Sequence, residues 1–309
     1  KFYIAALLFF FPVVTVFLLV EHFTLQVPES YINRSVYLLE EKDNLEVLLL
    51  GSSQINDGIN PALLSHPTIN LASGNQHHDT DLKKLKQVRP RLPKLKTVLI
   101  EVSYSHFELP HNGKNWWKNS AFLKFYGFNN FERNTYFKDK FLYISNLDYY
   151  SERLIDYHIR GNNERHYNRF GFNVTNFPGQ FEDHGYDLEV LDGCVFKINK
   201  IPNLRLFENN IKVFFEIMDY LREENLNVII CKAPMFNYYL RDRVPEILAR
   251  RDSIVRYTLK NYPNTTLLDL ETDTLSFTIR DYKNPSHLNP RGATVFSKRL
   301  QETLDDISN

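Results

Sequence analysis

The sequence predicts an α/β protein in which a five-stranded parallel sheet lies between two layers of helices. Short unbroken apolar runs alternate along the chain with segments whose apolar residues recur at steps of three and four. Strands that alternate with helices in this way require right-handed crossovers, which gives a three-layer α/β/α domain. The composition, with 43% hydrophobic and 14% aromatic residues among 309, is sufficient for one large core.

The first part of the chain supplies three of the expected strands. Residues 45–50 (LEVLLL) form an unbroken apolar run, as expected for a strand buried on both faces of a parallel sheet. Asn60 before Pro61 predicts a helix start, so residues 51–60 are expected to form the turn that joins this strand to a helix. Further strands are predicted at residues 69–72 and 97–103, with helices at residues 28–42 and 79–88.

The last third of the chain completes the sheet. An apolar stripe at helical spacing runs from Phe207 to Leu221 and leads into a fourth strand at residues 226–231. Another helix precedes the fifth strand, which is expected at residues 265–270. The final helix is expected from Pro290, with Asn289 as its cap.

Residues 104–206 interrupt the alternation of strands and helices. This stretch is rich in Tyr, Phe, Trp and Asn, contains Trp116 and Trp117 side by side, and has no sustained period. We interpret it as an insertion that covers the carboxyl ends of the strands, in the position of a lid. The two tryptophans are candidates for stacking on sugar faces, although aromatic clusters are more often packing than binding surfaces.

The amino terminus predicts a membrane anchor. Residues 2–20 contain no charge, and at about 1.5 Å per residue they are long enough for a hydrocarbon core of about 30 Å. Lys1 precedes this run and Glu21 follows it, which favours a cytoplasmic amino terminus and a domain outside the cytoplasm. We therefore expect a single-pass anchor at residues 1–22 and an α/β domain at residues 23–309. A cleaved signal peptide and a buried core helix are the competing interpretations.

The charge balance and the cysteine count exclude several classes of function. Lys and Arg total 37, as do Asp and Glu, so there is no basic surface of the kind that binds nucleic acid. Cys194 and Cys231 are too few for a disulfide scaffold and lack the spacing of a metal knuckle, so two buried thiols are expected, with a disulfide between them in an oxidising compartment as the alternative. His77, His78 and the aspartates after them are read as a helix start and not as a metal site. No cofactor is expected.

Two segments carry residues that suit nucleophilic catalysis. Residues 51–58 (GSSQINDG) follow the first strand, where a serine hydroxyl is exposed at the sheet edge and the N–H groups of a helix start can stabilise an oxyanion. Residues 281–292 (DYKNPSHLNPRG) place His287 on a loop directly before the last helix. A serine needs an adjacent base to act as a nucleophile, and an imidazole on a fixed loop supplies one.

These two segments resemble the SGNH (GDSL-type) hydrolase superfamily, a flavodoxin-like fold. Gly51-Ser52-Ser53 matches the first block of that family, which implies Ser53 as the nucleophile, and His287 matches the last block. Residues 70–76 (NLASGNQ) resemble the second block, which implies an oxyanion hole at Ser53, Ser73 and Gly74. Within this superfamily, the chain resembles membrane-anchored members, similar to those of alginate O-acetylation and teichoic acid D-alanylation.

The chain departs from the family at two places. Asn284 stands three residues before His287, where the family has Asp, so either Asn284 or Asp281 is expected to orient the imidazole. The third strand is followed by SYSHFE and has no Gly-x-Asn-Asp block. An amide from Asn75 or Gln76 is the candidate replacement for the missing oxyanion donor.

The resemblance implies an extracytoplasmic serine esterase or O-acyltransferase that acts on acyl groups, acetyl first among them, of a cell-surface glycan. Hydrolysis and transfer both remain open, and a membrane-embedded partner that delivers acyl groups is an expected companion of transfer. The alternative is a non-catalytic glycan-binding or assembly protein that retains the fold. The two differ in geometry, because only the enzyme requires the Ser53 hydroxyl within hydrogen-bond reach of His287.

Overall fold

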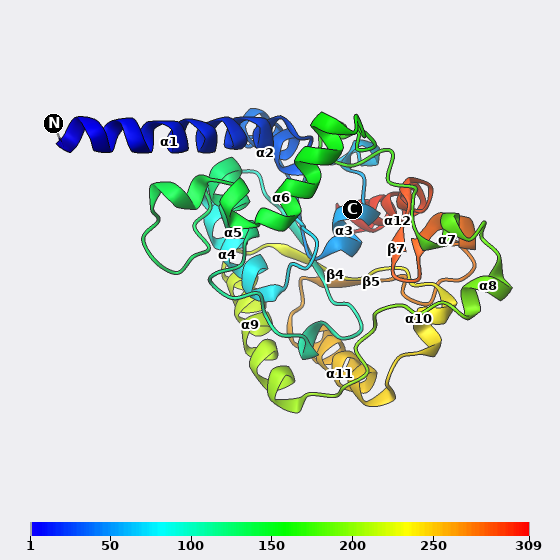
Figure 1. Cartoon of the computed structure of the whole chain (residues 1–309). Helices are drawn as coiled ribbons and strands as arrows, with labels where there is room; N and C mark the ends of the chain where they lie inside the picture. The colour runs from blue at the N-terminus through cyan, green and yellow to red at the C-terminus, as the bar shows by residue number, and fades with distance from the viewer. Residues whose placement is uncertain (1, 309) are drawn as a thin grey trace.

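Five parallel strands form the centre of the protein in a computed structural model that describes residues 2–308 (Figure 1). Their order in the sheet is β2-β1-β3-β4-β5, the order of the flavodoxin-like folds. The strands are β1 Val47–Leu50, β2 Thr68–Asn70, β3 Thr97–Glu101, β4 Asn227–Lys232 and β5 Thr265–Asp269. The predicted α/β fold class and its five-stranded parallel sheet are confirmed.

The sheet separates two apolar cores, which explains why its central strands are apolar without interruption. In β1, Leu48 and Leu50 belong to one core, whereas Val47 and Leu49 belong to the other. Helices α4 (His78–Val88) and α9 (Leu204–Glu223) bury their apolar stripes in the first core, and α12 (Pro290–Ser308) buries its stripe in the second. Because side chains alternate between the faces of a strand, only apolar residues satisfy both cores.

The chain after β1 differs from the prediction. A short helix, α3 (Ser53–Gly58), is separated from the strand by only two residues, where the sequence led us to expect a turn up to Asn60. Ser52 makes this early start possible, because its hydroxyl accepts a hydrogen bond from the N–H of Gln54 at 3.3 Å. Asn60 does act as a cap, but for the 3-10 turn Pro61–Leu63.

A small antiparallel ribbon was not predicted. Its strands are β6 (Tyr282–Asn284) and β7 (His287–Leu288), which lie directly before α12. Asn289 caps α12 as expected, because its Oδ1 accepts from the N–H groups of Arg291 and Gly292. The ribbon therefore fixes the segment 282–288 between two ordered elements.

Short helices and loops fill the stretch between β3 and α9. They are η3 His106–Glu108, α5 Lys118–Ala121, η4 Phe122–Tyr126, η5 Phe137–Lys140, η6 Tyr143–Ser145, α6 Leu147–Leu154, η7 Ile155–Ile159, α7 Gln180–Asp183 and α8 Leu188–Asp192. The remaining helices are α1 Phe2–Gln26, α2 Ser30–Glu41, η2 Arg89–Arg91, α10 Asn237–Arg241, α11 Pro245–Asn261 and η8 Ile279–Asp281.

Helix α1 projects from the body of the protein (Figure 1). Its residues Leu8–Gln26 are long and apolar enough to cross a membrane, and they are mostly exposed. A core helix of a soluble protein with the same composition is mostly buried. The exposure of α1 therefore distinguishes it from the core helix that the sequence left open as an alternative.

Candidate active site

The loop that carries Ser53 is held by a buried carboxylate. Gly51 has φ +140°, and a Cβ on it would lie 2.7 Å from Glu101, so the backbone there requires glycine. Glu101 at the end of β3 accepts hydrogen bonds from the N–H of Ser52 at 2.6 Å and from its hydroxyl at 2.8 Å. Burial raises the pKa of Glu101. This carboxyl group positions the start of α3.

Ser53 and His287 meet although 234 positions separate them in the chain. The hydroxyl of Ser53 lies 2.7 Å from Nε2 of His287. Nδ1 of His287 lies 2.9 Å from Oδ1 of Asn284, which accepts a hydrogen bond from it and fixes the ring. Burial lowers the pKa of His287 to about 4, so the imidazole is neutral at pH 7 and Nε2 is free to accept the serine proton.

Asn284, and not Asp281, contacts the imidazole. The carboxylate of Asp281 accepts from the N–H and the hydroxyl of Thr278, both at 2.7 Å, and Arg291 lies 2.9 Å from its other oxygen. Asp281 thus closes the turn before β6. The alternative in which it orients His287 is not supported by this arrangement.

The residues proposed for the oxyanion hole are only partly brought together. A Cβ on Gly74 would lie 3.9 Å from Cβ of Ser53, so the backbone of Gly74 is next to Ser53. Asn75, at φ +59°, follows it and lines a small cavity with Ser53. The amide of Gln76 instead donates to Asp81 at 2.6 Å, and its oxygen accepts from Lys84 at 2.5 Å. Gln76 is therefore not available as an oxyanion donor.

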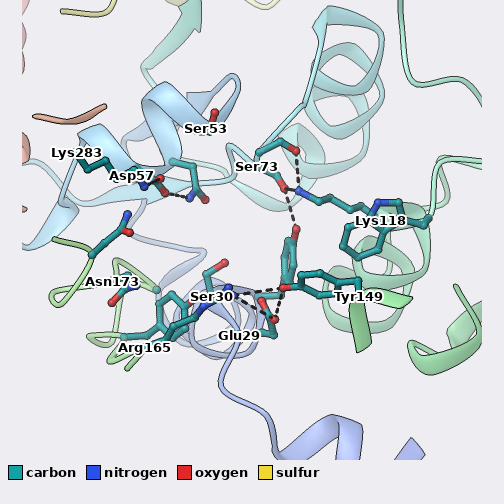
Figure 2. Close-up of a pocket in the computed structure, with 17 residues that line it drawn as sticks. Glu29, Ser30, Ser53, Asp57, Ser73, Lys118, Tyr149, Arg165, Asn173 and Lys283 are labelled. Atoms are coloured by element: carbon teal, nitrogen blue, oxygen red, sulfur yellow. Dashed lines mark hydrogen bonds and ion pairs between the residues drawn. The ribbon is translucent and has the colours of Figure 1, made fainter. Parts of the chain in front are cut away.

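Two cavities meet at Ser53. The larger, of about 300 Å³, extends from Ser53 and Asp57 to Glu29 and Arg165, which lie at its opposite end in Figure 2. The smaller, of about 150 Å³, is lined by residues that flank Ser53 in sequence and by residues 75–77. Space for an acyl group and for a second molecule is thus available on the two sides of the serine.

The insertion supplies much of the wall of the larger cavity. Trp117 lines it together with Tyr149 and Asn173, whereas Trp116 packs edge-to-face on Phe122 with ring centroids 5.7 Å apart. The binding role considered for both tryptophans is therefore available to Trp117 but not supported for Trp116.

Sequence reasoning missed Lys118. Its ammonium donates to the carbonyl of Gly74 at 2.6 Å and to the hydroxyl of Ser73 at 3.3 Å, and in Figure 2 it reaches Ser73 from across the cavity. Burial lowers the pKa of Lys118 to about 8. Within residues 2–308 no carboxylate lies within 4 Å of this ammonium. Apart from its place beside two tryptophans, nothing in the sequence marks this lysine.

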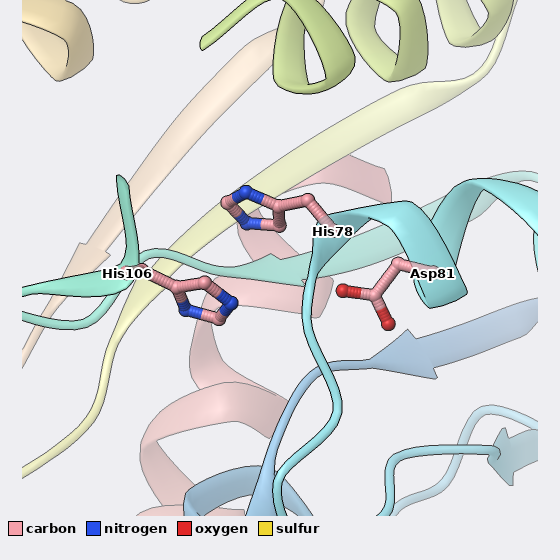
Figure 3. A group of neighbouring side chains, drawn as sticks. All are labelled: His78, Asp81 and His106. Carbon is pink, nitrogen blue, oxygen red and sulfur yellow. The ribbon is translucent and has the colours of Figure 1, made fainter. Parts of the chain in front are cut away.

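A second cluster of ligand-type side chains lies beneath the site. His78, Asp81 and His106 are buried, and one donor atom from each lies within 4.8 Å of the others (Figure 3). The two imidazole rings stack, with centroids 4.1 Å apart and planes at 3°. Lone pairs lie in the plane of an imidazole, so parallel stacked rings do not direct them at one ion. The arrangement favours packing of neutral rings over metal coordination.

No protein-family model matches this chain, and no curated protein matches it. Among solved structures, the chain is similar to a protein from Bacteroides fragilis that is described as a "putative acylhydrolase". The two are 11% identical, the match covers 93% of this chain and 94% of that chain, and the TM-score is 0.42. A similarity of this degree does not assign a function to the chain. Fold and site define an α/β protein with a serine–histidine pair at the carboxyl edge of its parallel sheet.

Proposed function

We propose that this protein is a serine esterase or O-acyltransferase of the SGNH type. The observation that carries the proposal is the connected set Ser53, His287 and Asn284, with contacts of 2.7 Å and 2.9 Å. A nucleophile, a neutral base and a group that orients the base are the three parts that serine catalysis needs.

In the proposed mechanism, Nε2 of His287 takes the hydroxyl proton while Oγ of Ser53 attacks the ester carbonyl. The N–H groups of Ser53, at the start of α3, and of Gly74 hold the oxyanion that forms. Collapse of this intermediate breaks the ester bond, and His287 returns its proton to the departing alcohol. Water or a second hydroxyl then attacks the acyl-serine, with His287 again as the base, and regenerates Ser53.

The acyl group in this proposal is short, acetyl first, and its carrier or acceptor is a glycan. The walls of the larger cavity support a polar ligand, since they combine Lys118, Arg165 and Asn173 with the ring of Trp117. Helix α1 would anchor the protein in the membrane with the domain outside the cytoplasm, where a membrane-embedded acyl donor would be its partner in a transfer reaction.

The proposal is tested with the full chain in detergent and p-nitrophenyl acetate as substrate. Ser53→Ala and His287→Ala are each expected to reduce kcat/KM at least about a thousandfold, because the triad members act as a unit. Ser253→Ala, on the exposed side of α11, is the matched control and retains activity. Activity that survives the Ser53 and His287 substitutions would show that the hydrolysis occurs elsewhere.

A non-catalytic glycan-binding protein is the second candidate, and Asn284 is the observation that favours it. An amide in place of a carboxylate orients the imidazole but stabilises an imidazolium less. A fluorophosphonate probe separates the two candidates, because it labels an activated serine whatever the natural substrate is. Labelling that requires both Ser53 and His287 supports the enzyme, whereas an unlabelled chain that retains glycan binding supports the second candidate.

A further inference from the structure

The carboxyl-terminal part of α1 is fixed to the insertion by a buried charge. Glu21 is only 4% exposed. Its carboxylate accepts from the N–H groups of Leu142 and Tyr143, both at 3.0 Å, and from the ammonium of Lys124 at 3.1 Å. Helix α1 also packs against α6 and η6. The insertion and α1 therefore form one unit around Glu21.

Aromatic contacts extend this unit along α1 into its apolar run. Phe17 packs edge-to-face on Phe141 with ring centroids 4.8 Å apart, and Phe141 packs in the same way on Phe137 at 5.0 Å. On another part of the helix, Nε2 of His158 donates to the carbonyl of Phe23 at 3.0 Å, and the imidazole packs on the ring of Phe23. Residues 137–158 thus lie beside α1 on both sides of Glu21.

The same segment exposes an unusual number of large apolar side chains. Their exposed fractions are Tyr136 61%, Phe137 79%, Ile144 43%, Leu147 53%, Ile155 40% and Ile159 77%. Exposed apolar groups that gather on one segment mark a surface that meets an apolar partner. We call residues 136–159 the aromatic collar.

The position of the collar along α1 identifies that partner. Phe17 lies three residues before the end of the apolar run at Val20, which is about 4.5 Å along the axis at 1.5 Å per residue. Phe141, which packs on Phe17, therefore lies beside the last turn of the apolar run, and Phe137 packs on Phe141. Lys138 and Lys140 follow Phe137 in the sequence, and lysine beside exposed aromatic rings is typical of the boundary between lipid and water.

We propose that the aromatic collar is a membrane-contacting surface, which inserts Phe137 and Ile159 into the headgroup region of the bilayer that α1 spans. This inference rests on the membrane anchor of the proposed function and not on its chemistry. It has a consequence for the active site, because Glu29, Ser30 and Tyr31 line the larger cavity only a few residues beyond α1. The cavity would thus be held close to the membrane surface by two attachments instead of one flexible tether.

The test uses the full chain reconstituted in phosphatidylcholine vesicles, with a nitroxide label at one position at a time. Cysteine is introduced in place of Phe137 or Ile159 in a chain with Cys194→Ser; Cys231 is fully buried. Phe10→Cys in α1 reports on insertion of the anchor. Tyr257→Cys is a matched aromatic control, 54% exposed, on α11, a helix that lies far from α1 in Figure 1. Power saturation with oxygen and with a water-soluble nickel complex then gives the depth of each label.

We expect the ratio of oxygen to nickel accessibility at positions 137 and 159 to lie between that at position 10, in the hydrocarbon, and that at position 257, in water. If the labels at positions 137 and 159 have the same accessibilities as the label at position 257, while position 10 lies in the lipid, the membrane contact of the collar is wrong and the anchor still holds. A label at position 10 in water would overturn both. Hydrolysis by Ser53 is measured separately in the same vesicles, so a failure of the chemistry is not confused with a failure of the collar.

Discussion

The neutral residue beside His287 gives the sharpest test of the catalytic site. In the structure, Asn284 Oδ1 accepts from Nδ1 of His287 at 2.9 Å and also from the N–H of Ser286 at 3.0 Å. The change Asn284→Asp keeps both acceptor contacts and adds a negative charge. An opposite charge at this separation raises the pKa of the imidazole by roughly 1–3 units. The pKa of His287, which burial lowers to about 4, is then expected at about 5 to 7.

The added charge stabilises the imidazolium that forms in the transition state. Since one pKa unit corresponds to about 1.4 kcal/mol, kcat/KM on the alkaline plateau is expected to rise roughly tenfold or more. Asn284→Ala removes the hydrogen bond from Nδ1 of His287, which becomes charge-assisted when the imidazolium forms in the transition state. Such a hydrogen bond is worth about 1.5–3 kcal/mol, so kcat/KM is expected to fall roughly ten- to a hundredfold.

The assay is kcat/KM for p-nitrophenyl acetate between pH 3 and pH 9. The wild type requires neutral His287, so activity is expected to rise as the pH increases through about 4 and then to reach a plateau, which extends to about pH 8, where Lys118 loses its proton. In Asn284→Asp this rise moves to higher pH while the plateau increases. An unmoved acid limb in Asn284→Asp, or an Asn284→Ala variant as active as the wild type, would refute the assigned role of Asn284.

The remaining predictions concern the cavity, the nucleophile loop and the histidine cluster. Lys118→Met is expected to reduce kcat/KM for polar esters about tenfold. Because the pKa of Lys118 is about 8, the wild type is expected to lose activity above pH 8, and this loss is expected to be absent from the variant. The control is Lys197→Met, at an exposed position. Gly51→Ala is expected to destabilise the fold by at least about 1–3 kcal/mol in urea unfolding, because its backbone has φ +140° and its Cβ meets Glu101. Burial lowers the pKa of His78 to about 3, so below about pH 6.5 the unfolded chain binds more protons than the folded chain. The free energy of unfolding therefore falls as the pH decreases from about 6.5 to about 3. His78→Asn is expected to reduce this pH dependence, measured as the melting temperature. A chelator is expected to leave both activity and melting temperature unchanged, since the stacked rings do not converge on an ion.

The fold was predictable because a strand that is buried on both faces has a nearly continuous run of apolar residues in its sequence. Residues 47–50 pack into two cores at once, so every position of this strand is apolar. All five segments that the sequence predicted as strands are strands of the sheet. The ribbon of β6 and β7 has no such run. Its strands have three and two residues and carry polar side chains, and it is fixed by its neighbours and not by its own pattern.

The site was predictable where position along the chain determines chemistry. Ser53 follows β1 and His287 precedes α12, so the fold class alone brings both to the same edge of the sheet. Glu101 and Lys118 act through contacts with residues about 45 or more positions away, at Ser52 and at Gly74. No local periodicity or capping pattern encodes such a contact, which is why their roles emerge only from the three-dimensional structure.

The charge that is missing at position 284 is partly supplied from elsewhere. Burial is the largest single effect on Asp57 and opposes its ionisation. Lys283, 2.7 Å away, together with His287 and a hydrogen bond from Asn56, outweighs burial, so the pKa of Asp57 is lowered and the group is ionised at pH 7. Its negative charge raises the pKa of His287 against the larger effect of burial. Asp57 thus favours the imidazolium from a distance, while Asn284 orients the ring. Orientation and charge, which one carboxylate supplies in a Ser-His-Asp triad, are divided here between two residues. Lys283 acts against Asp57, because its positive charge lowers the pKa of His287. The imidazole is therefore well oriented, but its protonated form is only weakly stabilised. We expect that a carboxylate at position 284, which supplies both orientation and charge, makes the enzyme faster.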